Sequence, residues 1–189
     1  MDSFSLKPTQ PREVTLKIKN SFPFFFFCIL LSLSIPLSAV AATSIEQIRQ
    51  NVVKLWKPIK QNQPHVNAVE FKKIMDSGQD FVLLDVRTEK EYNAAHLPGA
   101  IHINRGLIEW IVPNRIQDPG KRIYVYCRTG ARSAFATQRL IEMGYTNVTN
   151  ISDAFRGWVV AGYPVYNRHG EFTLKPEAFE KKDPYIDEE

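Results

Sequence analysis

The chain has 189 residues, enough for one main domain and a small addition but not for two full hydrophobic cores. Its composition is that of a globular protein, with 44% apolar and 12% aromatic residues. The formal net charge is +4, but residues 1–41 hold four basic and two acidic residues, so only +2 falls on the rest. This charge gives no support to nucleic-acid binding.

The first segment of the chain has the pattern of an export signal. A polar, basic stretch precedes an apolar run at 24–35, and small residues follow it at 38–42. The run is shorter than the roughly 20 residues of a membrane span, and the small residues suit a signal peptidase. We therefore expect residues 1–41 to be a cleavable export signal. The mature protein would start near Ala42, in the periplasm or outside the cell, with no stable membrane insertion; an uncleaved leader that anchors it is the alternative.

The two cysteines of the chain have different expected fates. Cys28 lies in the apolar run of the leader and would leave with it, whereas Cys127 stays. Cys127 would then have no internal partner in a compartment that favours disulfides. A single thiol in such a place is either buried and inert or reactive for a purpose.

Residues 42–63 are expected to form an amphipathic helix and a linker. Ser44 and Gln47 have the spacing of a capping box. One apolar face then repeats with the helical period: Ile45, Ile48, Val52, Leu55 and Ile59. Pro58 predicts that this helix ends near Trp56, because proline disrupts a helix interior, and the stretch KQNQPH then forms the linker.

From residue 64 to 165, strands and helices alternate. Strands are expected at 81–87, 100–104, 122–127 and 147–152. Helices are expected from the cap residue Asn67 to Gly78 and at 89–95, 132–144 and 153–162, with a helical turn at 106–112. This order predicts an α/β fold with a mostly parallel central sheet and helices on both faces. Residues 166–189 are expected to be a charged C-terminal extension, its last part, 170–189, extended over the surface.

The stretch YVYCRTGARS carries the chemistry. Cys127 follows a buried strand, and the next helix begins within five residues. Ligands of open α/β sheets bind beyond the carboxyl ends of the strands. The loop therefore places its backbone N–H groups at a helix N-terminus, where partial positive charge collects, and Gly130 lets it curl tightly. Together with Arg128 and Arg132 this favours a reactive thiolate beside an anion site, against the alternative of an inert core cysteine.

Three motifs resemble the rhodanese-like family of sulfurtransferases, over about residues 64–165. LLDVRTEKEYNAAHLPGAIHI resembles the first signature of the family, YVYCRTGARS its six-residue active-site loop from Cys127 to Arg132, and FRGWVVAGYPV its carboxyl-terminal signature. Two positions depart from the family pattern. Asp153-Ala154 stands where relatives often carry two glycines, and Asn104 where a proline is common; the first can reshape the wall near the loop, and neither touches the nucleophile.

The resemblance implies a sulfurtransferase that moves a sulfane sulfur from thiosulfate or a similar donor through a persulfide on Cys127. The acceptor would be cyanide or a thiol, including the thiol of a partner protein. The persulfide and the anions would be bound by the rest of the loop: Arg128, Thr129, Gly130, Ala131 and Arg132. Neither a metal nor another cofactor is implied.

Four further residues lie near the expected site. Asp85 and Arg87 end the preceding strand on the same side of the sheet, and we expect them to be structural, through a salt bridge or hydrogen bonds. His96 precedes the turn LPGA and is expected to fix that turn. Arg105 follows the strand at 100–104, and it either faces the pocket or is a solvated surface side chain.

Two other functions fit parts of this pattern. A cysteine phosphatase also uses a cysteine at a strand end, an anion cradle and an arginine, but its loop is one residue longer. Here four residues separate Cys127 from Arg132, and Ser133 follows, so the loop suits a single sulfur atom better than a phosphate. A non-enzymatic module that keeps the fold and binds a partner typically lacks the nucleophile, which this chain has. Sulfur transfer is therefore the preferred hypothesis.

Overall fold

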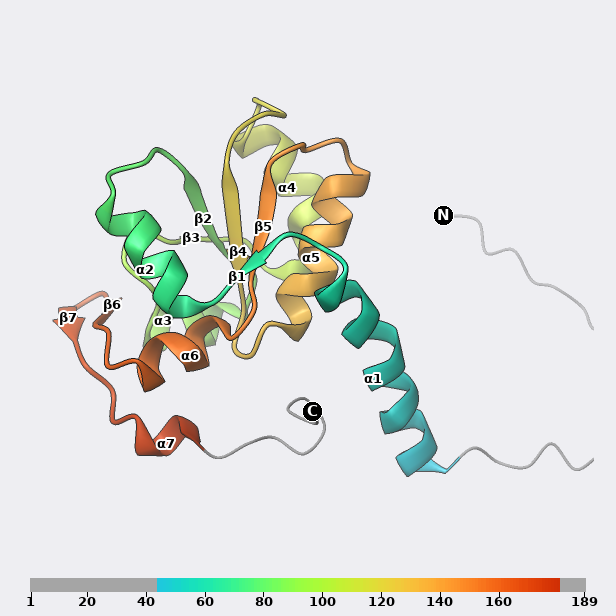
Figure 1. Cartoon of the computed structure of the whole chain (residues 1–189). Helices are drawn as coiled ribbons and strands as arrows, with labels where there is room; N and C mark the ends of the chain where they lie inside the picture. Colours follow the sequence, from blue (N-terminus) through green and yellow to red (C-terminus); the bar gives the residue numbers. More distant parts are fainter. Residues whose placement is uncertain (1–43, 181–189) are drawn as a thin grey trace, which may run out of the picture. The chain divides into compact units, whose positions relative to one another are not determined.

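The computed structural model of the protein describes residues 44–180, so the predicted export signal lies outside the described residues (Figure 1). A five-stranded sheet with the order β1-β5-β4-β2-β3 forms its centre, and every neighbouring pair is parallel. The strands are β1 (His65–Val66), β2 (Val82–Asp85), β3 (Ile101–His102), β4 (Ile123–Tyr126) and β5 (Val148–Ile151). The predicted fold class is confirmed.

Helices cover both faces of the sheet, as predicted. On one face lie α2 (Ala68–Asp76), α3 (Glu89–Ala94) and α6 (Ala154–Val160), and on the other lie η1 (Arg105–Leu107), α4 (Ile108–Arg115) and α5 (Ala131–Glu142) (Figure 1). Successive strand residues point to opposite faces. Leu83 therefore packs in the core on the α2 and α6 side, and Leu84 in the core on the α5 side. This two-sided burial explains the continuous apolar run of β2.

The segment after α6 folds back onto the domain. β6 (Val165–Asn167) and β7 (Gly170–Phe172) form an antiparallel hairpin, and α7 (Glu177–Glu180) follows. Phe172, Leu174 and Phe179 are partly buried against the core. The expectation of an extended segment is therefore wrong for 170–180, because its spaced apolar side chains gain contacts that the high charge of the sequence conceals. Residues 181–189 lie outside the described part.

Helix α1 (Ile45–Gln61) is longer than the sequence predicts. Ser44 caps it by accepting a hydrogen bond from the Gln47 amide at 3.1 Å. The expected end near Trp56 is wrong, since the helix continues through Pro58, whose carbonyl accepts from the amide of Asn62 at 3.0 Å. A proline removes only one donor of the helix, and the last turns of α1 pack along α5.

The stretch expected to be a linker thus holds the end of α1 and the edge strand β1. The N-terminal part of α1 leaves its apolar face exposed, at Ile45, Ile48, Val52 and Leu55. Across residues 44–180, the structure contains no helix with both the length and the hydropathy that crossing a membrane requires.

Candidate active site

Strand β4 and helix α5 position the candidate nucleophile. Cys127 directly follows β4 at the carboxyl edge of the sheet, and its side chain is buried, with 1% of the residue exposed. Its sulfur accepts a hydrogen bond from the backbone N–H of Gly130 at 3.2 Å. Gly130 is also the N-cap of α5, and no side chain caps this helix. The loop therefore places one backbone donor on the sulfur and an uncapped helix N-terminus beside it.

Gly130 occupies a position that other residues cannot take. Its φ is +95°, and a Cβ built on it would lie 2.0 Å from the carbonyl oxygen of Ser152. A side chain at this point would combine backbone strain with a collision against the turn that follows β5. The tight curl of the loop around Cys127 thus depends on glycine.

Two buried polar residues hold the loop in place through hydrogen bonds. The Ser133 hydroxyl lies 2.7 Å from Asn150 Oδ1, 3.1 Å from the Gly130 carbonyl and 3.5 Å from Cys127 Sγ. Both Ser133 and Asn150 are fully buried, so these contacts form without competition from water. They tie β5 to the loop and fix the first turn of α5.

Arg132 makes a forked ion pair with Glu91 of α3. Its Nη1 and Nη2 donate to the two carboxylate oxygens at 2.8 and 2.7 Å. The hydrogen bond from Arg132 is the main reason that the pKa of Glu91 is lowered to about 2, although partial burial opposes the shift. The pKa of Arg132 is raised, chiefly by the bond to Glu91 and further by the charge of Cys127. Arg132 is therefore held near the sulfur by a carboxylate, with two of its nitrogens already engaged.

The other loop residues have distinct surroundings. Arg128 is exposed at the mouth of the loop. The Thr129 carbonyl accepts a hydrogen bond from Lys60 Nζ of α1 at 3.5 Å, and Ala131 is the first residue of α5. The last turn of α1 is thereby in contact with the loop, which the sequence did not predict.

Asp85 and Arg87 form a buried ion pair at the carboxyl end of β2. Arg87 Nη2 donates to Asp85 Oδ2 at 2.6 Å and to the carbonyl of Ala95 at 2.6 Å. The guanidinium also lies 4.2 Å from the centre of the Phe155 ring. These contacts tie the end of β2 to the segment after α3 and to α6.

His96 lies in that segment. Its ring stacks on Tyr92 with centroids 4.0 Å apart, and its Nδ1 lies 3.0 Å from the Tyr92 carbonyl. Its backbone exchanges two hydrogen bonds with Tyr166 of β6, at 2.8 and 2.9 Å. Arg105 stacks over the ring of Phe135 at 5.1 Å and lines a different hollow from the one at the mouth of the loop.

Known proteins resemble the part of the chain that holds this site. Residues 67–161, half of the chain, match the family model described as a rhodanese-like domain. The chain belongs to the rhodanese-like family. It is 33% identical over 94 residues to a protein of Allochromatium vinosum named sulfurtransferase, covering 49% of this chain and 84% of that one. It is 34% identical over 95 residues to YrkF of Bacillus subtilis, which is named as a sulfur carrier protein, covering 50% of each.

A solved structure extends the likeness to the fold. The polysulfide-sulfur transferase homodimer of Wolinella succinogenes is 25% identical, with a TM-score of 0.56, and the match covers 65% of this chain and 92% of that one. The chain spans half or less of the length of several curated relatives that it matches. What is shared with those relatives is the rhodanese-like domain.

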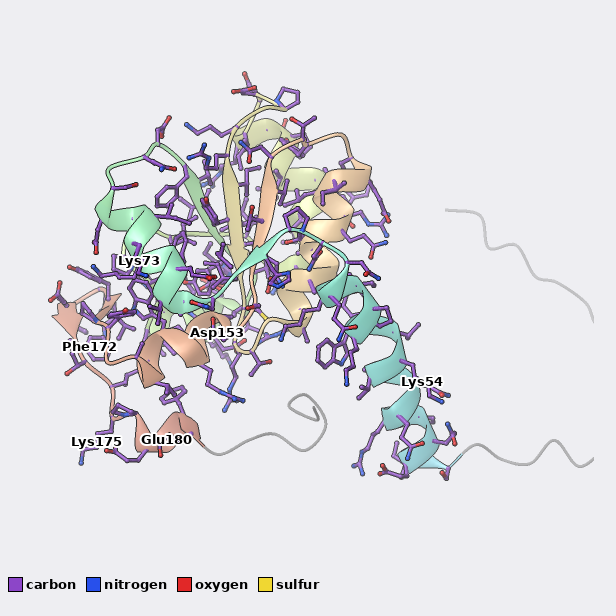
Figure 2. All side chains as sticks on the ribbon, viewed as in Figure 1. Lys54, Lys73, Asp153, Phe172, Lys175 and Glu180 are labelled. Carbon is purple, nitrogen blue, oxygen red and sulfur yellow. The ribbon has the colours of Figure 1, made fainter. Side chains whose placement is uncertain are left out.

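At the first departure from the family pattern, Asp153 lies at the turn between β5 and α6 (Figure 2), and Ala154 is the first residue of α6. Asp153 Oδ1 accepts from the Ala68 amide at the start of α2 at 2.7 Å. Burial raises the pKa of Asp153, and this hydrogen bond opposes the rise. Ala154 has a φ of 53°, a value that favours glycine. Asp153 therefore links the start of α6 to the start of α2, and Ala154 introduces local backbone strain.

Sequence reasoning missed four residues of this rhodanese-like site: Glu91, Ser133, Asn150 and Lys60. Glu91 had a local signal, because it completes the capping box of α3 with Thr88. Its second role, as the partner of Arg132 41 residues away, has no local signature. Asn150 and Lys60 likewise reach the loop only through the fold.

Proposed function

We propose that the protein is a sulfurtransferase that carries sulfur as a persulfide on Cys127. The observation that carries the proposal is the position of Cys127 Sγ. The sulfur accepts a hydrogen bond from the Gly130 amide at the uncapped N-terminus of α5. A helix N-terminus and oriented amides stabilise a thiolate and, after transfer, a negative terminal sulfur. The likeness to a protein named sulfurtransferase supports the same chemistry.

The first half-reaction is a displacement at sulfur. The Cys127 thiolate attacks the outer sulfur of thiosulfate, and a new S–S bond forms. The S–S bond of the donor breaks, and its electron pair leaves with sulfite. In the second half-reaction a thiolate or cyanide takes the outer sulfur, and the electron pair of the persulfide bond returns to Cys127. Arg128 at the mouth of the loop is placed to bind the incoming or leaving anion.

Loop size favours this proposal over phosphate chemistry. Four residues separate Cys127 from Arg132, and the two terminal nitrogens of Arg132 are engaged by Glu91. A phosphatase needs a loop that surrounds a tetrahedral phosphate and an arginine fork that faces it. The loop present here encloses one sulfur atom more closely than it would a phosphate group.

We also propose that the protein is exported after cleavage near Ala42 and that its natural acceptor is a small thiol or a protein thiol. Export rests on the sequence of residues 1–41, and the protein acceptor on the relative named as a sulfur carrier.

Steady-state turnover tests the function. With thiosulfate and cyanide, the protein from residue 42 onward should release thiocyanate and sulfite in equal amounts, and Cys127→Ser should release neither. An aryl phosphate serves as the rival substrate. Hydrolysis of the phosphate at a higher specificity constant than sulfur transfer would reverse the assignment.

A further inference from the structure

A cavity of about 340 Å³ opens beside the active-site loop, and we call it the side pocket. Six of its lining residues enter the argument: Arg87, Glu91, Arg128, Phe155, Leu174 and Phe179. The volume lies in the lower part of the range of pockets that bind small organic molecules, roughly 300–1,000 Å³. Thiosulfate, a small inorganic anion, has no group that would fill such a space.

The side pocket borders the active-site loop through Arg128, although Cys127 is not itself among its lining residues. Arg128 belongs to the loop itself, and Glu91 holds Arg132 beside Cys127. Phe155 donates its backbone N–H to the Cys127 carbonyl at 3.1 Å. A molecule in the side pocket would therefore have one end next to the mouth of the loop.

The charges around the side pocket leave one cation available. Arg87 is paired with Asp85, and Glu91 is paired with Arg132. In the part of the chain from 44 to 180, no hydrogen bond or ion pair engages the Arg128 guanidinium. The free positive charge thus lies at the end of the side pocket that belongs to the loop, where it suits the anionic end of a ligand.

The rest of the wall is apolar: Ala94, Ala95 and Phe155 form one part of it, and Leu174 and Phe179 of the C-terminal segment form the other. Phe179 of α7 packs edge-on against Phe155, with ring centroids 5.9 Å apart, and Leu174 completes the wall. Leu174 and Phe179 lie beyond residues 67–161, the part that matches the family. Figure 2 shows this segment folded beside α6, between the labelled residues Phe172 and Glu180.

We infer that the side pocket selects sulfur donors whose anionic end is joined to an apolar organic group, with an organic thiosulfonate as the simplest member. The inference rests on the proposed sulfur transfer through Cys127. The apolar group would occupy the wall of Phe155, Leu174 and Phe179, and the sulfonyl oxygens would face Arg128. The Cys127 thiolate attacks the outer sulfur, and the S–S bond of the donor breaks. The electron pair leaves on an organic sulfinate, so the step balances without an oxidant or a reductant.

The test compares two donors in the same protein. Sulfur uptake by Cys127 is measured with benzenethiosulfonate and with thiosulfate, and the ratio of the two specificity constants is the readout. The unaltered protein should prefer benzenethiosulfonate. Phe179→Ala and Leu174→Ala should each lower this ratio by about tenfold, the usual effect of removing an apolar contact to a substrate group. The ratio is internal to each variant, so a general loss of folded protein does not change it.

Phe172→Ala is the matched control, because Phe172 packs against the same core in the same segment but does not line the side pocket. It should leave the ratio unchanged. Sulfur uptake from thiosulfate with no preference for benzenethiosulfonate, or a ratio that Phe179→Ala and Leu174→Ala do not lower, overturns the inference and leaves the proposed function in place. No uptake from either donor overturns both.

Discussion

Gly130→Ala is expected to remove most of the sulfur uptake by Cys127 while the protein still folds. A Cβ at residue 130 would lie 2.0 Å from the Ser152 carbonyl oxygen, whereas real Cβ contacts under 3.0 Å essentially do not occur. The loop and the turn after β5 must therefore separate by about 1 Å. A displacement of this size near a reacting group lowers rates by about a hundredfold.

Gly144→Ala supplies a matched control for this prediction. Gly144 also has a positive φ, +103°, but nothing lies within 4 Å of a Cβ built there. The left-handed backbone should destabilise both variants by about 1–2 kcal/mol, and the collision should add to this cost in Gly130→Ala, as urea unfolding would measure. Only Gly130→Ala should lose the single-turnover release of sulfite from thiosulfate. The reasoning is refuted if Gly130→Ala reacts as fast as the unaltered protein, or if Gly144→Ala loses as much activity.

Three further predictions concern the residues around the loop. Arg128→Ala should lower the specificity constant for thiosulfate about ten- to hundredfold, and Arg128→Lys should restore it only in part, since a charge-assisted hydrogen bond is worth about 1.5–3 kcal/mol; unchanged steady-state kinetics would remove Arg128 from the site. The Glu91 pKa is depressed from 4.5 to about 2, chiefly by Arg132, so the stability it contributes is complete above pH 4.5 and is lost as the pH falls through about 2. Urea unfolding across this pH range should show that Glu91→Gln lacks this part of the pH dependence, and identical profiles would contradict it. Ala154→Gly should raise the free energy of unfolding by up to about 1 kcal/mol, because it relieves a φ of 53°; a lower urea midpoint would show that no strain is stored there.

The parts of the fold that could be predicted are those with local causes. Asn67 begins α2 with a full capping box, and the apolar runs before Asp85 and Cys127 became neighbouring central strands. The loop after Cys127 followed from one strand end and one helix start. In each case the residues that decide the structure are adjacent in the sequence.

The parts that were missed depend on distant contacts. The two-residue strand β1 exists because it pairs with β5, and α1 continues past Pro58 while packing along α5. The C-terminal segment folds because Phe172, Leu174 and Phe179 meet the core, although its composition is polar. Glu91 reaches Arg132 only when α3 and α5 are both in place. No hydrophobic periodicity or motif within these segments indicates which distant residues they contact.

The central claim, a persulfide on Cys127, is tested most directly by mass spectrometry of the intact protein incubated with thiosulfate and no acceptor. The protein should gain the mass of one sulfur atom and lose it again when cyanide is added, because the two half-reactions are separate. Cys127→Ser should gain nothing while keeping its fold. A protein that turns over thiosulfate but never carries the extra sulfur, or that carries it in Cys127→Ser, would contradict the account.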